Sequence, residues 1–87
     1  MNKVMMSSQR ICPFCDRAER LLRSRGVENI EKIMIDMDIG QREQMLTRTG
    51  RRTVPQIYIG ETHVGGFDDL VAIDRDGGLT PLLSGDA

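Results

Sequence analysis

Two cysteines three positions apart are the residues of this chain whose types and spacing best suit chemistry. Cys12 and Cys15 enclose Pro13 and Phe14 in the segment Cys-Pro-Phe-Cys. Such a pair can cycle between a dithiol and a disulfide. Free cysteines can also be inert core residues, and a closed zinc site needs about four Cys or His ligands. Because the chain adds only His63 to the two cysteines, the pair indicates thiol–disulfide exchange.

The residues around the pair predict a helix start that gives the two thiols different roles. Cys12 suits the N-cap, and Pro13 suits the first helical position, where its missing N–H costs nothing. The sulfur of Cys12 can then face the free N–H groups of Phe14 and Cys15, and the helix dipole favours its thiolate. We therefore expect Cys12 to be the nucleophile. Cys15, one turn further in, is expected to be the resolving thiol that releases the substrate.

Composition excludes several classes of function. The chain has 87 residues, is 39% hydrophobic and 29% charged, and carries a net charge of −1. This length predicts one domain over residues 1–87. The near-neutral charge and the three aromatic residues argue against nucleic acid as a partner, and no apolar run is long enough for a membrane span or signal peptide. We expect a cytoplasmic monomer, in a compartment where thiols stay reduced.

The remaining pattern predicts the elements that position the cysteines. Apolar residues at helical spacing follow Pro13, branched apolar residues form short runs further on, and glycines close the helical segments. Gly60-Glu61 is a two-residue loop that suits a type II′ hairpin. The expected strands cover residues 3–7, 30–36, 56–59 and 62–64, and the second of them, rich in branched apolar residues, is expected to be buried. The expected helices cover residues 13–25, 41–49 and a last segment that Asp68-Asp69 can cap and Gly77-Gly78 can close. This order, β-α-β-α-β-β-α, predicts an α/β, thioredoxin-like fold with a four-stranded mixed sheet flanked by helices.

A second motif, Thr53-Val54-Pro55, opens the third strand. A proline at this place is best explained by a cis peptide bond, although a trans proline at the start of an edge strand is the alternative. A cis bond would turn the backbone of Val54 outward. Its N–H and C=O could then pair with an extended peptide beside the nucleophilic sulfur.

Three segments together resemble a family. Cys-Pro-Phe-Cys, then Arg-Arg-Thr-Val-Pro-Gln-Ile-Tyr-Ile at residues 51–59, then His-Val-Gly-Gly-Phe-Asp-Asp-Leu at residues 63–70 look like a dithiol glutaredoxin of the short bacterial type. The resemblance runs from Val4 to Leu83. It implies a glutathione-disulfide oxidoreductase that reduces protein disulfides and glutathione mixed disulfides, with glutathione as reductant and no metal.

The resemblance also implies where glutathione lies. Its cysteine moiety would pair with the backbone of Val54, and its γ-glutamyl carboxylate would be received at the start of the last helix. Arg51, helped by Arg10, is the expected partner of the glycine carboxylate. The implied binding residues are Phe14, Arg51, Thr53, Val54, Pro55, Gly66, Phe67 and Asp68.

The sequence departs from the family pattern near the first cysteine. Gln9 stands where a lysine is usual, and Met6 replaces the usual aromatic residue of the first strand. Losing the lysine removes one anchor and one source of thiolate stabilisation, so we expect weaker glutathione binding unless Arg10 compensates. Phe14 replaces the commoner tyrosine, which keeps an apolar rim and removes a hydroxyl.

Two other functions fit the same residues. Two chains could share a [2Fe–2S] cluster through Cys12 of each and two glutathione thiols, although the rigid Pro13 argues against this. The dithiol could also take its electrons from thioredoxin reductase. His63, the single histidine, is expected to be exposed in a hairpin strand and to have no chemical role.

Overall fold

The computed structural model of the chain describes residues 1–85. Its elements are β1 (Val4–Ser8), α1 (Pro13–Ser24), β2 (Ile30–Met34), α2 (Ile39–Thr49), β3 (Gln56–Ile59), β4 (Thr62–Gly65), α3 (Phe67–Arg75) and α4 (Leu79–Ser84). Each strand expected from the sequence is present, as are the three expected helices. The domain predicted over residues 1–87 includes residues 86 and 87, which lie outside the described residues.

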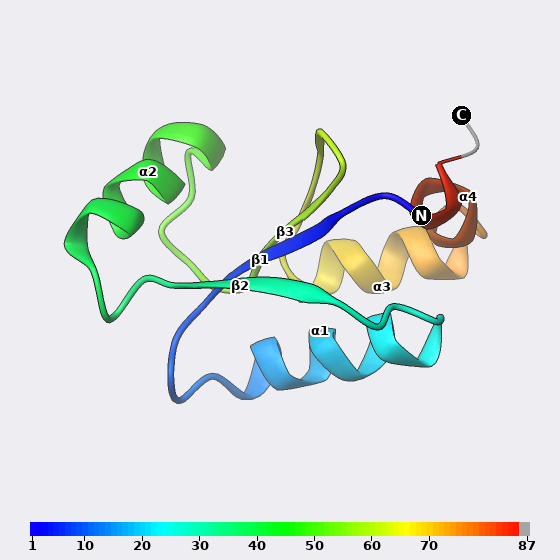
Figure 1. Cartoon of the computed structure of the whole chain (residues 1–87), viewed down its shortest axis with the longest axis horizontal. Helices are drawn as coiled ribbons and strands as arrows, with labels where there is room; N and C mark the ends of the chain where they lie inside the picture. The colour runs from blue at the N-terminus through cyan, green and yellow to red at the C-terminus, as the bar shows by residue number, and fades with distance from the viewer. Residues whose placement is uncertain (86–87) are drawn as a thin grey trace.

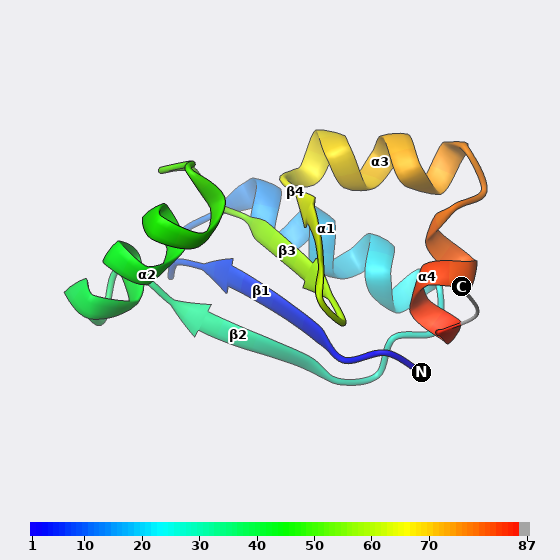
Figure 2. The same ribbon diagram turned by 90° about the horizontal axis from the view of Figure 1, so that it is seen from above.

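The four strands form one mixed sheet in the order β2-β1-β3-β4. β1 runs parallel to β2 and antiparallel to β3, and β3 pairs with β4 as an antiparallel hairpin. Helices α1 and α3 lie on one face of the sheet, and α2 lies on the other (Figures 1 and 2). This is the thioredoxin-like arrangement that the sequence predicts.

The main core fills the space between the sheet and the helices α1, α3 and α4. Side chains alternate between the two faces of a strand, so Val4 and Met6 of β1 point to this core beside Ile59 and Ile57 of β3. The helices contribute four leucines and an alanine that are nearly fully buried: Ala18, Leu22, Leu70, Leu79 and Leu83. Both cysteines belong to the same cluster, so the packing that stabilises the fold also holds the redox pair.

Local signals explain where the elements begin and turn. Asp38 caps α2 by accepting a hydrogen bond from the Gly40 N–H at 2.8 Å, and Gly50 ends that helix in the left-handed conformation. In the β3–β4 hairpin, Gly60 has a φ of +59° while Glu61 has a negative φ. A type II′ turn needs a positive φ at its first central residue only, so this prediction is confirmed.

Two expectations about the elements need correction. The second strand was expected to be buried, but Ile33 and Met34 are only half-buried because β2 is the edge strand and pairs with β1 alone. No helix is expected after Gly78, whereas α4 follows it directly. This helix has only six residues, which is too short for helical periodicity to stand out.

Within residues 1–85, no helix is both long and apolar enough to span a bilayer.

Candidate redox-active site

Cys12 and Cys15 form a disulfide at the start of α1. Cys12 is the N-cap residue, Pro13 is the first helical residue, and the Cys15 N–H donates to the Cys12 sulfur across 3.1 Å. This confirms the predicted helix start; of the two amides expected near the sulfur, that of Cys15 makes the bond. Cys12 is 8% exposed and Cys15 is 3% exposed. Cys12 is therefore the more exposed residue of the pair, as expected of the nucleophile.

The Val54–Pro55 peptide bond is cis, as the sequence predicts. The carbonyl oxygen of Val54 lies 4.0 Å from the Cys12 sulfur. A disulfide sulfur carries no hydrogen, so this is a packing contact and not a hydrogen bond. The contact places the Val54 backbone beside the sulfur that a thiol would attack.

A cavity of about 350 Å³ opens beside the disulfide. Its volume is within the range of roughly 300–1,000 Å³ that is typical of small-molecule sites. The cavity brings together the start of α1, the loop before β3 and the start of α3. It is lined by every binding residue expected from the sequence, together with Asp69: Phe14, Arg51, Thr53, Val54, Pro55, Gly66, Phe67, Asp68 and Asp69.

Two aromatic rings form an apolar wall of this cavity. The rings of Phe14 and Phe67 have centroids 6.0 Å apart and are tilted by 40°. The Arg17 guanidinium lies 5.3 Å from the centre of the Phe14 ring, within the distance of a cation–π contact. Phe14 is nevertheless 52% exposed, so part of its ring remains free to contact a ligand.

The charged side of the cavity is built around Asp69. One carboxylate oxygen of Asp69 accepts hydrogen bonds from Arg51 Nη1 and from the Gly66 N–H, each at 2.8 Å. The bond from Arg51 is the main cause that holds the pKa of Asp69 below its usual range, and the Gly66 bond adds to it. Arg51, the expected partner of the glycine carboxylate, is therefore already paired with Asp69. Asp68 is exposed on the same rim.

Asp69 is a site residue that sequence reasoning used only as a helix cap. Its position gave a signal, since an acidic residue three after an N-cap can bond back to the N-cap N–H. Gly66 is that N-cap, and Asp69 makes this bond. The same carboxylate thus closes the start of α3 and binds the Arg51 side chain.

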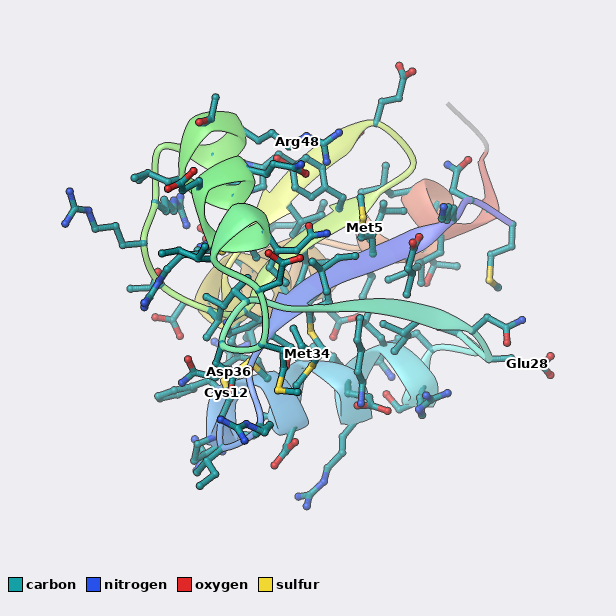
Figure 3. All side chains as sticks on the ribbon, turned by 60° about the vertical axis from the view of Figure 1, so that its left-hand side comes forward. Met5, Cys12, Glu28, Met34, Asp36 and Arg48 are labelled. Atoms are coloured by element: carbon teal, nitrogen blue, oxygen red, sulfur yellow. A yellow bond between two sulfur atoms is a disulfide. The ribbon has the colours of Figure 1, made fainter. Side chains whose placement is uncertain are left out.

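The segment before Cys12 is held by a different ion pair. Arg10 Nε lies 2.8 Å from Asp36 Oδ2, and this bond keeps the pKa of Asp36 below its usual range. Cys12 and Asp36 lie at the same end of the molecule (Figure 3). Arg10, expected as a helper for a carboxylate, does not line the cavity beside the disulfide; it lines a separate hollow with Gln9, whose side chain donates to the Ile11 carbonyl at 3.2 Å.

The expectation that His63 is exposed is wrong. His63 is half-buried, and its Nε2 lies 2.8 Å from Oε1 of Gln56. Gln56 is completely buried and was not singled out from the sequence. A signal existed, because Gln56 is a polar residue in an otherwise apolar strand, immediately after the proline of the second motif.

Comparison with known proteins agrees with this geometry. The sequence profile of the glutaredoxin family matches residues 4–64. Glutaredoxin 3 of Escherichia coli (strain K12) is 48% identical over 83 residues, which cover 95% of this chain and 99% of that protein.

Solved structures give the same result. A glutaredoxin from Brucella melitensis superimposes with a TM-score of 0.83 at 40% identity, covering 100% of this chain and 95% of that one. The buckwheat glutaredoxin–glutathione complex superimposes with a TM-score of 0.87 at 32% identity, covering 95% and 77% of the two chains. With its Cys-Pro-Phe-Cys disulfide, the chain belongs to the glutaredoxin family of thiol–disulfide oxidoreductases.

Proposed function

We propose that this chain reduces glutathione mixed disulfides and protein disulfides through Cys12, and that glutathione returns it to the dithiol form. The observation that carries the proposal is the cavity beside the disulfide, which all the expected glutathione-binding residues line. The buckwheat relative, with a TM-score of 0.87, has glutathione bound. Glutathione is the reductant used by the glutaredoxin family.

A protein disulfide is reduced in two thiol–disulfide exchange steps. The Cys12 thiolate attacks one substrate sulfur, forms a mixed disulfide and releases the other substrate sulfur as a thiolate that takes up a proton. Cys15 then loses its proton and attacks the Cys12 sulfur, so the second substrate thiol leaves. Two electrons pass to the substrate, and the Cys12–Cys15 disulfide is the oxidised product.

Glutathione reverses this oxidation in two steps. A glutathione thiolate attacks Cys12, breaks its bond to Cys15 and forms a Cys12–glutathione mixed disulfide. A second glutathione thiolate attacks the glutathione sulfur of that mixed disulfide, releasing glutathione disulfide and the Cys12 thiolate. The Cys15 N–H, 3.1 Å from the Cys12 sulfur, stabilises the leaving thiolate because a thiolate accepts hydrogen bonds more strongly than a thiol.

The proposed binding mode follows the groups that line the cavity. The backbone of Val54 pairs with the cysteine moiety of glutathione, and Thr53 and cis Pro55 present that backbone. The first N–H groups of α3, near Gly66 and Phe67, receive the γ-glutamyl carboxylate, and Asp68 pairs with the ammonium group of the same moiety.

The other carboxylate of glutathione meets a cation that already has a partner. Arg51 binds Asp69 through Nη1 at 2.8 Å, but a guanidinium has five N–H donors. The remaining donors of Arg51 are free to bind the glycine carboxylate. We further propose that the chain acts as a monomer in the cytoplasm, where low-molecular-weight thiols keep the pair reduced.

Single-cysteine variants test this proposal. Cys12→Ser should abolish glutathione-dependent reduction of a peptide–glutathione mixed disulfide. Cys15→Ser should retain this reaction, because the Cys12 thiolate alone takes the glutathione from the substrate and a second glutathione thiolate then removes it. It should lose the reduction of protein disulfides, in which Cys15 releases the reduced protein. Turnover is measured as NADPH consumption coupled through glutathione reductase.

Two results would count against the proposal. Activity that persists in Cys12→Ser would refute the assigned nucleophile. Equal or faster turnover with thioredoxin reductase in place of glutathione and glutathione reductase would refute glutathione as the electron donor. The matched control is the parent chain assayed with each reductant at the same protein concentration.

A further inference from the structure

Gln56 directly follows Pro55, which lines the cavity, and its side chain is fully buried. Gln56 is 0% exposed and is the first residue of β3. It pairs with Ser7 of β1, whereas its neighbour Ile57 pairs with Met6 in the main core. Side chains alternate along a strand, so Gln56 lies on the sheet face opposite α1 and α3. Met5 and Arg48 lie on this α2 side in Figure 3.

The partners of Gln56 fix the orientation of its amide. Its Nε2 lies 3.0 Å from the Thr53 carbonyl oxygen, and its Oε1 lies 2.8 Å from Nε2 of His63. A carbonyl oxygen can only accept a hydrogen bond, so the NH₂ group of Gln56 must face Thr53. Oε1 is therefore an acceptor, and His63 Nε2 must carry the hydrogen that it receives.

His63 is itself held in place. Its ring packs on Tyr58 with centroids 4.9 Å apart. Burial, followed by the nearby Arg51 charge, lowers the pKa of His63, while Asp69 acts in the opposite direction. The lowered pKa favours the neutral ring, and the contact with Gln56 Oε1 places the hydrogen of that neutral ring on Nε2.

This chain of contacts ends at the reactive sulfur. Thr53 and Val54 both line the cavity, and the Val54 carbonyl lies 4.0 Å from the Cys12 sulfur. Gln56 holds the backbone one residue before Val54, and His63 holds Gln56. We propose that Gln56 and His63 are positioning residues, which align the Thr53–Val54 backbone with the substrate thiol bound beside Cys12. The kinetic part of this inference rests on the proposed function.

Two substitutions of His63 separate hydrogen bonding from packing. His63→Phe keeps an aromatic ring beside Tyr58 but has no donor for Gln56, whereas His63→Gln restores an N–H donor at nearly the same reach. His63→Phe should raise KM for a peptide–glutathione mixed disulfide by roughly 2- to 12-fold, the range expected for one neutral hydrogen bond. kcat should change less than KM, because the cysteines are untouched. His63→Gln should return KM toward the parent value.

Spectroscopy of the glutathione-free protein tests the same contacts without any turnover. In the parent chain, ¹⁵N shifts of the His63 ring should show the Nε2–H tautomer. The backbone amide signals of Thr53 and Val54 should move in His63→Phe and in Gln56→Met, and should return toward their parent positions in His63→Gln. Thermal unfolding of each variant establishes that the protein remains folded.

The outcomes separate this inference from the proposed function. An unchanged KM in folded His63→Phe, or equal KM values in His63→Phe and His63→Gln, would overturn the positioning role. If the parent does not turn over the mixed disulfide at all, the proposed function fails, and the amide signals alone decide the role. Signals of Thr53 and Val54 that stay fixed in both His63→Phe and Gln56→Met would then overturn it.

Discussion

At the scale of single residues, Asp69 joins two parts of the site with one oxygen. That oxygen binds the Arg51 side chain and the Gly66 N–H, which come from the loop before β3 and from the start of α3. Both bonds are stronger for a carboxylate than for a carboxylic acid. The protonation state of Asp69 therefore affects the stability of the fold and the shape of the cavity rim together.

The lowered pKa of Asp69 predicts a dependence of stability on acid pH. Because the folded-state pKa lies below the ordinary value of 3.8, the charged form stabilises the fold above that value. This contribution is lost as the pH falls through the folded-state pKa. Asp69→Asn keeps an acceptor for both partners but carries no charge, so its free energy of unfolding should fall less between pH 5 and pH 2.

Urea unfolding of the two proteins at a series of pH values measures this difference. Near pH 7 the variant should be less stable by at most about 1 kcal/mol, since the ion pair is partly exposed and screened by water. Asp68→Asn, a change at the neighbouring exposed carboxylate, is the control. Parallel pH profiles for the parent and Asp69→Asn would contradict the prediction.

Some residues of the site are predictable from the sequence, and others are not. The cysteine pair and the cis proline can be predicted from residue type and spacing alone. Asp69 and Gln56 act through hydrogen bonds to backbone groups. No local sequence pattern predicts which segments lie close enough to form such bonds. The Arg51–Asp69 pair likewise joins residues 18 positions apart, and no local pattern indicates it.

At the scale of elements, the junction between β4 and α3 shapes one side of the cavity. Gly65 ends β4 with a φ of +115°, and a Cβ built on it would overlap the Asp69 side chain. Gly66 follows as the N-cap of α3. A side chain at position 65 would thus disturb both the turn and the carboxylate that binds Arg51.

Substitution of two glycines separates these effects. Gly77, just after α3, also has a positive φ, of +79°, but a Cβ there meets no atom within 4 Å. Gly77→Ala should cost only the strain of a positive φ, about 1–2 kcal/mol. Gly65→Ala should cost roughly 1–3 kcal/mol more, because the Asp69 bond to Gly66 is also displaced.

Chemical unfolding gives both free energies, and KM for the glutathione mixed disulfide gives the second readout. Gly65→Ala should raise KM, since the cavity rim moves, while Gly77→Ala should leave KM unchanged. Equal costs in stability for the two variants, with equal KM values, would show that the overlap with Asp69 is relieved without consequence.

The elements themselves were mostly predictable because their signals are local. The proline and cysteine at the start of α1, the Gly60-Glu61 hairpin and the runs of branched apolar residues each act within a few positions. The burial of β2 was not predictable in this way. Its residues suit a buried strand, but its place at the sheet edge depends on the order in which the four strands pair.

At the scale of the whole molecule, the last described helix and the first residues close the fold together. Asn2 donates its backbone N–H to the Leu83 carbonyl at 2.7 Å and its side-chain amide to the Leu82 carbonyl at 2.9 Å. The N-terminus and α4 lie side by side in both ribbon views (Figures 1 and 2). This closure covers the core at the end of the sheet far from the cysteines.

Leucine substitutions measure how much the fold depends on α4, a helix too short for its sequence pattern to predict. Leu83 is 2% exposed in the main core, whereas Leu46 of α2 is 37% exposed. Leu83→Ala should lower the free energy of unfolding by roughly 2–5 kcal/mol, because it leaves a cavity in a packed core. Leu46→Ala, an identical change on a partly exposed helix face, should cost less than about 1 kcal/mol. Urea unfolding followed by far-ultraviolet circular dichroism compares the two, and similar costs would show that α4 is dispensable for the core that holds the cysteine pair.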